Sequence, residues 1–226
     1  PVGVEKVLPA EHIVLTHGHE DHMHRPSLER LYKQATVWFP YQWRAGIEDY
    51  MKHIGFAKVK EAVTLRTHDL GPHTRLTYLA YSLESIVVIE SGGLVIVNIN
   101  DALNSNHENV VMMFLEVLKK HWPHIDSLIT GFSGAGYFPN QVRYPGKNDR
   151  EVGQVREQYF AHHLCTAVDF LKPDVVIPFA PGFALLEEQN RWINEVKFDR
   201  RLLPAYHEEH IAPLGNTLYV TAWPGD

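Results

Sequence analysis

The stretch LTHGHEDHMH, residues 15–24, decides how this sequence is interpreted, because it places four histidines and two acidic residues in ten positions. It overlaps the apolar, β-branched run HIVLT at residues 12–16, which is typical of a buried strand. One or two histidines at the end of a strand would indicate a solvated polar turn. Four of them, interleaved with acids, indicate a site that binds metal.

The spacing within this stretch explains how its side chains can act together. Alternate residues of an extended segment point the same way, so His17 and His19 can converge on one point. Gly18 lets the backbone turn, and Asp21 and His22 can then face a neighbouring point. Neutral imidazole suits zinc and iron, and a carboxylate adds negative charge. The pattern therefore predicts a centre of one or two metal ions.

Composition limits the remaining classes of function. The chain has 226 residues, 45% of them hydrophobic, with a formal net charge of -6, which argues against nucleic acid or an anionic membrane as the main partner. No apolar run is long enough for a membrane span, and no signal peptide is recognisable. The single cysteine, Cys165, excludes an internal disulfide and favours a cytoplasmic location.

Strand and helix patterns alternate along the chain, which predicts one α/β domain over residues 1–226. Gly92-Gly93 predicts a hairpin turn between the apolar runs 74–91 and 94–100. Strands are predicted at 12–17, 36–40, 60–66, 125–130, 174–180 and 217–223. Helices are predicted at 25–35, 41–55, 108–122, 152–172 and 184–197.

The motif THGHEDH resembles the signature of the metallo-β-lactamase superfamily, and the resemblance covers most of the chain. It implies an αββα sandwich with a metal site at one sheet edge. It also implies that Asp101, in NIND, bridges two metals and that Asp21 binds one metal and orients the attacking hydroxide. The family has strands before the signature that are missing here, so we expect an N-terminally incomplete domain, with a missing N-terminal segment or a companion domain as partner.

Two later stretches, FSGAGYFPNQVRYPG and FLKPDVVIPFAPGF, resemble the metallo-β-lactamase-like portion of CMP-N-acetylneuraminate hydroxylase and its bacterial relatives. Those proteins often carry a Rieske iron–sulfur domain. With one cysteine, this chain alone cannot hold such a cluster.

Two departures from the family pattern affect the ligand set. The family normally has a histidine before the second strand of the hairpin, but none occurs here between His73 and the turn at Gly92-Gly93. Glu84 is the expected replacement ligand, with Tyr81 and Ser82 as weaker candidates. Ala180 stands where the family's last histidine would be. The second metal would then keep only Asp21, His22 and Asp101 from this chain, unless another histidine reaches in; the candidates are His68, His73, His207 and His210.

The remaining histidines have other expected roles. His12 and His24 could orient a metal ligand through its other ring nitrogen. His162 and His163 are expected on the surface or in the core of a helix. A solvated acidic turn is the more ordinary interpretation of YHEEH, which contains His207 and His210.

Three functions remain open at this point. The first is a metal-dependent hydrolase that uses a zinc- or iron-activated water on an ester, amide, lactone or phosphodiester. The second is an iron-dependent hydroxylase or oxygenase, favoured by the oxygen-rich ligand set that Glu84 would create. The third is a degenerate metal-binding or structural module, favoured by Ala180. The substrate is expected to be a small molecule, bound by the loop that holds Tyr137 and Arg143.

Overall fold

The computed structural model describes residues 9–41, 46–132, 138–139, 141–180 and 184–222. The chain forms two compact units, one up to Asn100 and one from Asp101 to Ala222. Both units contain strands and helices, so the α/β class expected from the sequence is confirmed. No helix among the described residues is both long and apolar enough to cross a membrane.

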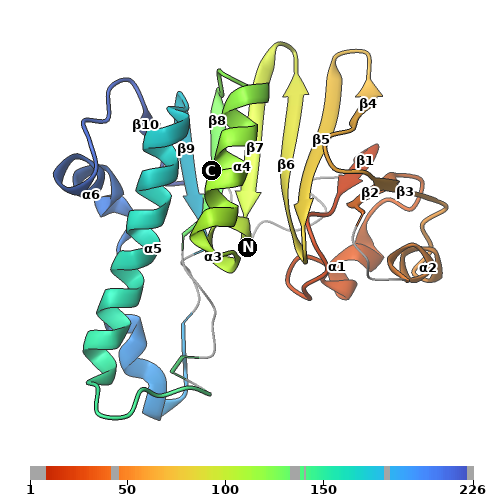
Figure 1. The fold of residues 1–226 in the computed structure, drawn as a ribbon. Helices are drawn as coiled ribbons and strands as arrows, with labels where there is room; N and C mark the ends of the chain where they lie inside the picture. The colour runs from red at the N-terminus through yellow and green to blue at the C-terminus, as the bar shows by residue number, and fades with distance from the viewer. Residues whose placement is uncertain (1–8, 42–45, 133–137, 140, 181–183, 223–226) are drawn as a thin grey trace. The chain divides into compact units, whose positions relative to one another are not determined.

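The first unit contains a parallel three-stranded sheet in the order β1-β2-β3. These strands are β1 (His12–Val14), β2 (Thr36–Pro40) and β3 (Lys58–Ala62), and helices α1 (Arg25–Arg30) and α2 (Ile47–His53) connect them (Figure 1). Every residue of β2 is buried, which is expected of a strand covered on both faces.

The two faces of β2 contact different parts of the first unit. Val37 and Phe39 belong to one apolar cluster with residues of α1 and α2. Trp38, between them in sequence, faces the other way and packs with Leu76 and Tyr78. The Tyr78 hydroxyl donates to the carbonyl oxygens of Leu15 and Trp38, at 2.9 and 3.2 Å. This contact holds the segment that leads into the histidine motif, and burial raises the pKa of Tyr78, so the hydroxyl keeps its proton.

The other strands of the first unit form an antiparallel series. They are β4 (Thr67–Gly71), β5 (Thr74–Tyr81), β6 (Glu84–Ser91) and β7 (Leu94–Asn100). The turn at Gly92-Gly93 is where the sequence predicts it, and both glycines have positive φ. Strand β4 and the second turn, at Ser82-Leu83, are not predicted from the sequence. That turn uses Ser82 at φ 55°, without the glycine that normally marks such a turn.

The second unit contains three parallel strands, β8 (Ser127–Gly131), β9 (Val175–Phe179) and β10 (Leu218–Tyr219). Its helices are α3 (Ala102–Ser105), α4 (Glu108–His121), α5 (Asp149–Leu171) and α6 (Leu203–His210), with 3₁₀ helices η2 (Glu188–Glu195) and η3 (Arg200–Leu202). Helices α4 and α5 lie on the same face of β8 and β9 (Figure 1).

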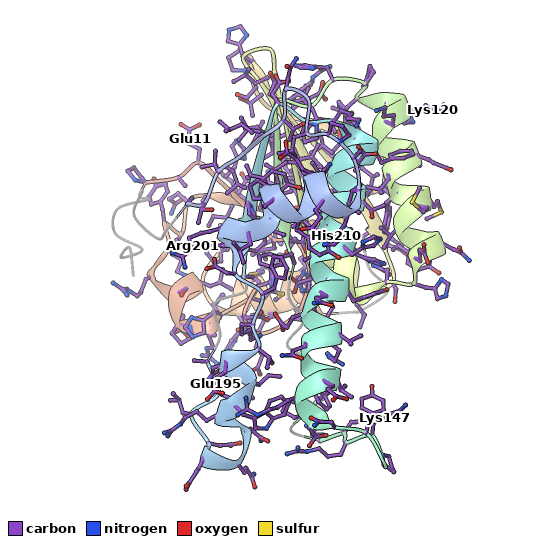
Figure 2. All side chains as sticks on the ribbon, turned by 90° about the vertical axis from the view of Figure 1, so that its left-hand side faces the viewer. Glu11, Lys120, Lys147, Glu195, Arg201 and His210 are labelled. Carbon is purple, nitrogen blue, oxygen red and sulfur yellow. The ribbon has the colours of Figure 1, made fainter. Side chains whose placement is uncertain are left out.

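Helix α5 extends well past the strands of its unit, and η2 runs beside its first turns, as the position of Glu195 in Figure 2 shows. Arg150 of α5 donates to Glu195 at 2.8 Å. Gly153 permits this approach, because a Cβ there would lie 3.0 Å from both the Trp192 and Val196 side chains. The helix predicted at 184–197 is therefore a shorter 3₁₀ helix held against a glycine.

Candidate metal centre

The histidine motif begins where β1 ends. The Leu15 amide donates to the Trp38 carbonyl at 2.9 Å, and the chain then leaves the sheet. The amides of His22 and Met23 both donate to the His19 carbonyl, at 3.0 and 2.8 Å, which closes a tight turn. This turn brings His22 back toward His17, and their ring centroids lie 4.0 Å apart.

Glu84, the first residue of β6, is distant from this turn in sequence but lies beside it in the structure. Its Oε2 lies 3.3 Å from His17 Nδ1, and its Oε1 lies 3.7 Å from His19 Nδ1. His17 and Glu84 are buried, whereas the His19 side chain is 46% exposed. The Glu84 carboxylate thus points to the His17 and His19 side of the site, as expected for a residue that replaces the missing histidine.

The second pair of predicted ligands lies on the open side of the same turn. The Asp21 carboxylate is 79% exposed, and its Oδ2 lies 3.5 Å from His22 Nε2. His22 Nδ1 faces inward, 3.2 Å from the Thr16 hydroxyl. The two ring nitrogens of His22 therefore face different surroundings, one the protein and one the edge of the site.

These donors fit a metal ion. Nitrogen and oxygen atoms of His17, His19 and Glu84, one from each, lie within 4.8 Å of one another. Imidazole and carboxylate together suit zinc, iron and manganese. The site combines the buried carboxylate of Glu84 and the buried ring of His17 with the half-exposed ring of His19, so it can hold a cation close to the surface.

Asp101 directly follows Asn100, the last residue of β7, and is the N-cap residue of α3. The strand-end position expected for it is correct. Asn100 has a positive φ of 45°, so the chain turns sharply immediately before the aspartate. Asp101 is the first residue of the second unit.

Several other expected residues have different surroundings. Arg143 forms an ion pair with Asp149 and donates to Asn190 at 2.9 Å, so an anionic substrate group would compete with these partners. Tyr137 lies outside the described residues. Ala180 is exposed and directly follows β9, with φ 54°.

The spare histidines of the first unit are engaged elsewhere. His12 Nε2 lies 2.9 Å from the Leu70 carbonyl, and its Nδ1 accepts from the Trp38 indole at 3.1 Å. His24 is the N-cap residue of α1 and bonds Ser27. His68 packs on Trp38 with ring centroids 5.0 Å apart, and burial lowers its pKa.

In the second unit, the solvated acidic turn expected for YHEEH is wrong, because this stretch is part of helix α6 and His207 is buried. His207 Nδ1 lies 3.0 Å from the Tyr219 hydroxyl, which donates to Cys165 Sγ at 3.5 Å. His210 stacks near Tyr206 and is largely open to solvent. These contacts tie α6 to α5 and β10.

A second group of metal-type side chains also lies in the second unit and was not expected from the sequence. His124 Nε2 is 3.5 Å from Asp126 and 3.4 Å from Asp174. The His124 and Asp174 side chains are 64% and 58% exposed, so ordinary surface ion pairing explains the group.

Two solved structures are similar to this chain. Zn²⁺-bound PqqB from Methylobacterium extorquens has 18% identity over 54% of this chain, with a TM-score of 0.36. This chain spans 43% of that PqqB chain. A protein from Thermotoga maritima, described as a Zn-dependent hydrolase of the metallo-β-lactamase superfamily, has 11% identity, with 82% of this chain and 80% of that chain covered and a TM-score of 0.40.

The Thermotoga maritima protein carries the name of the same superfamily that the histidine motif resembles. Neither structure is a CMP-N-acetylneuraminate hydroxylase, so that closer resemblance stays a prediction. No protein-family model matches the sequence, and no curated protein matches it significantly.

Proposed function

We propose that this protein is a metal-dependent hydrolase of the metallo-β-lactamase type. The observation that carries the proposal is the convergence of His17, His19 and Glu84 around one point, with Glu84 buried between the two rings. Glu84 is 65 residues after His19 in sequence, so the fold brings two separate segments together here. A carboxylate buried beside two imidazoles is an arrangement in which a bound cation can compensate the negative charge.

The proposed centre has two metal positions. The first is held by His17, His19 and Glu84. The second is held by Asp21 and His22. Asp101 would be the bridging ligand by the resemblance to the superfamily. It directly follows Asn100 at the end of β7, and the Asn100 side chain donates to the Ser85 carbonyl, next to Glu84 in sequence.

A metal held by these residues would supply a hydroxide at neutral pH and would polarise a carbonyl or phosphoryl oxygen. The residues of the chain orient these groups. The Asp21 carboxylate is 79% exposed and can accept a proton from water on the open side of the site. Thr16 and the buried Glu84 hold the histidine rings in place from the protein side.

Iron-dependent oxidation is a second candidate, and one observation favours it. Glu84 is positioned to give the buried metal an oxygen ligand where a histidine would otherwise supply nitrogen. Ligand sets richer in carboxylate favour iron and manganese over zinc. The identity of the metal in active protein therefore separates the two chemistries.

The test is metal analysis of the purified protein, followed by assays with zinc- and iron-loaded samples. We expect bound zinc and hydrolysis of a model ester, lactone or phosphodiester, abolished by chelation and restored by zinc. Oxygen consumption that requires iron would support the second candidate instead. A protein that binds neither ion after reconstitution would overturn both and leave a degenerate module.

A further inference from the structure

The residues next in sequence to three proposed ligands, His17, Glu84 and Asp101, are hydrogen-bonded to one another. Thr16 precedes His17, Ser85 follows Glu84, and Asn100 precedes Asp101. The Ser85 hydroxyl donates to the Thr16 carbonyl, and the Asn100 amide donates to the Ser85 carbonyl at 2.5 Å. Two hydrogen bonds thus connect three segments that are far apart in sequence, immediately beside the residues proposed to bind metal.

The connecting residues are shielded from water. Ser85 and Asn100 are 0% and 1% exposed. A buried hydrogen bond that loses one partner leaves the other desolvated, so such bonds restrict the geometry more strongly than the same bonds on a surface.

The Thr16 side chain contacts the ligands themselves. Its Oγ1 lies 3.1 Å from His17 Nδ1 and 3.2 Å from His22 Nδ1. A hydroxyl oxygen has two lone pairs and can accept from both N–H groups. Histidines that donate from Nδ1 carry their lone pair on Nε2, the atom that is then available to a metal. The Thr16 hydroxyl can therefore set the tautomer of His22. At His17 it acts together with Glu84, whose Oε2 lies 3.3 Å from the same Nδ1.

Asn100 adds a backbone constraint. Its φ of 45° lies in the left-handed region, which asparagine tolerates better than most residues. Its amide N–H donates to the Asn98 side chain at 3.0 Å, so the turn is fixed from both directions. The residue that follows this turn is Asp101.

We propose that Thr16, Ser85 and Asn100 are positioning residues that align the metal ligands, with Thr16 selecting the Nε2-ligating tautomer of His22 and supporting that of His17. This inference rests on the proposed metal centre. The network lies wholly within the first unit, and its hydrogen bonds make no use of the metal, so it holds the ligands ready before an ion binds.

The test compares Zn²⁺ affinity of metal-free variants, measured by competition with a chromophoric chelator. Thr16→Val keeps the shape and removes the hydroxyl, whereas Thr16→Ser restores it. We expect Thr16→Val to weaken binding roughly 10–100-fold, as loss of an outer-shell partner of a metal ligand does, and Thr16→Ser to bind nearly as tightly as the wild type. Co²⁺-loaded Thr16→Val should also show a shifted visible absorption spectrum.

Thr77→Val is the matched control. Thr77 is buried in the same unit, and its hydroxyl bonds Thr67 at 3.0 Å, away from the proposed ligands. We expect it to change thermal unfolding of the metal-free protein without changing Zn²⁺ affinity. Asn100→Gly provides a second variant, because glycine keeps the positive φ and removes only the side-chain amide.

Three results would count against the proposal. Unchanged Zn²⁺ affinity in both Thr16→Val and Asn100→Gly would show that the network only joins strands. A loss of affinity in Thr77→Val as large as in Thr16→Val would show a general stability effect. A wild-type protein that binds no Zn²⁺, Fe²⁺ or Mn²⁺ would instead remove the metal centre on which the inference rests.

Discussion

Two buried histidine regions, one in each unit, differ in how their polar atoms are arranged. Around His17, the donors converge: atoms of His19 and Glu84 gather within 4.8 Å of it. Around His207, the contacts form a chain, because its two ring nitrogens face different partners, the Tyr219 hydroxyl and Asp169.

In the region around His207, each ring nitrogen of the histidine has a partner within the protein. The Tyr219 hydroxyl donates in turn to Cys165 Sγ. Burial raises the pKa of the Cys165 thiol to about 11, so the thiol stays protonated at neutral pH. The converging region brings a carboxylate and two rings toward a common point. Neither feature alone distinguishes a metal ligand, because His207 is buried without converging acids and the exposed group of His124, Asp126 and Asp174 converges without burial. The region around His17 combines burial with convergence, which is the reason for proposing it as the metal centre.

The largest expected effect separates the two regions directly. His17→Ala or His19→Ala should lose most of the tightly bound metal, by more than the roughly 10–100-fold that an outer-shell change causes. His207→Asn should keep the wild-type metal content. Metal-to-protein ratios after gel filtration check both; equal loss in all three variants would break the comparison.

Glu84 should give the next largest effect. Glu84→Ala removes the carboxylate beside His17 and should lower metal content, and Glu84→Gln should do so as well, because the negative charge is lost in both. Wild-type stoichiometry in Glu84→Gln would show that the residue only supports the fold. Thermal unfolding of the metal-free variants provides the control for folding.

His207→Asn should affect stability instead. Removing the imidazole leaves the Tyr219 hydroxyl without its ring partner, which should destabilise the protein by about 1–3 kcal/mol in urea unfolding. His210→Asn is the control, since that side chain is 45% exposed and should change stability little. Equal effects of the two substitutions would show that the buried chain contributes nothing.

The pH dependence of the same variant sharpens this result. Burial lowers the pKa of His207, so the unfolded chain takes up a proton on acidification before the folded protein does. The wild type should therefore lose stability as the pH falls from above about 6.5 toward the lower folded pKa. His207→Asn should show a shallower loss over that window, measured by urea midpoints at several pH values.

The smallest effect concerns the second metal. With Ala180 in place of a histidine, we expect one tightly bound ion and one lost on dialysis. Ala180→His should slow the loss, since histidine tolerates the positive φ found there better than most residues. Two equally tight ions in the wild type would contradict this. His73 is no substitute ligand, because it precedes Thr74, which pairs with Ser91 at the end of β5 and β6 opposite Glu84.

The sequence predicted the elements whose pattern is local. Strand 36–40, the turn at Gly92-Gly93 and helix 108–122 follow from periodicity and turn chemistry, and the structure confirms them. The turn at Ser82 was missed because no glycine marks it, so strands β5 and β6 were taken as one run.

The candidate site was also predictable only where its pattern is local in sequence. The histidine spacing predicted His17, His19, Asp21 and His22 as ligands, and the missing family histidine suggested Glu84; the structure places Glu84 beside His17 and His19. Thr16, Ser85 and Asn100 could not be found, because their hydrogen bonds join segments up to 69 residues apart. Burial of His207 was missed for the same reason: its partner Tyr219 belongs to another element.

Gly153 has a consequence for the behaviour of the protein on warming. A methyl group there would meet the Trp192 and Val196 side chains at 3.0 Å, while alanine would favour the helix itself by roughly 1 kcal/mol. Helix α5 would then persist while η2 separates from it, and the Arg150–Glu195 ion pair is among the contacts that would oppose this. An exposed ion pair of this kind is weak, so Gly153→Ala is expected to give a temperature-sensitive variant.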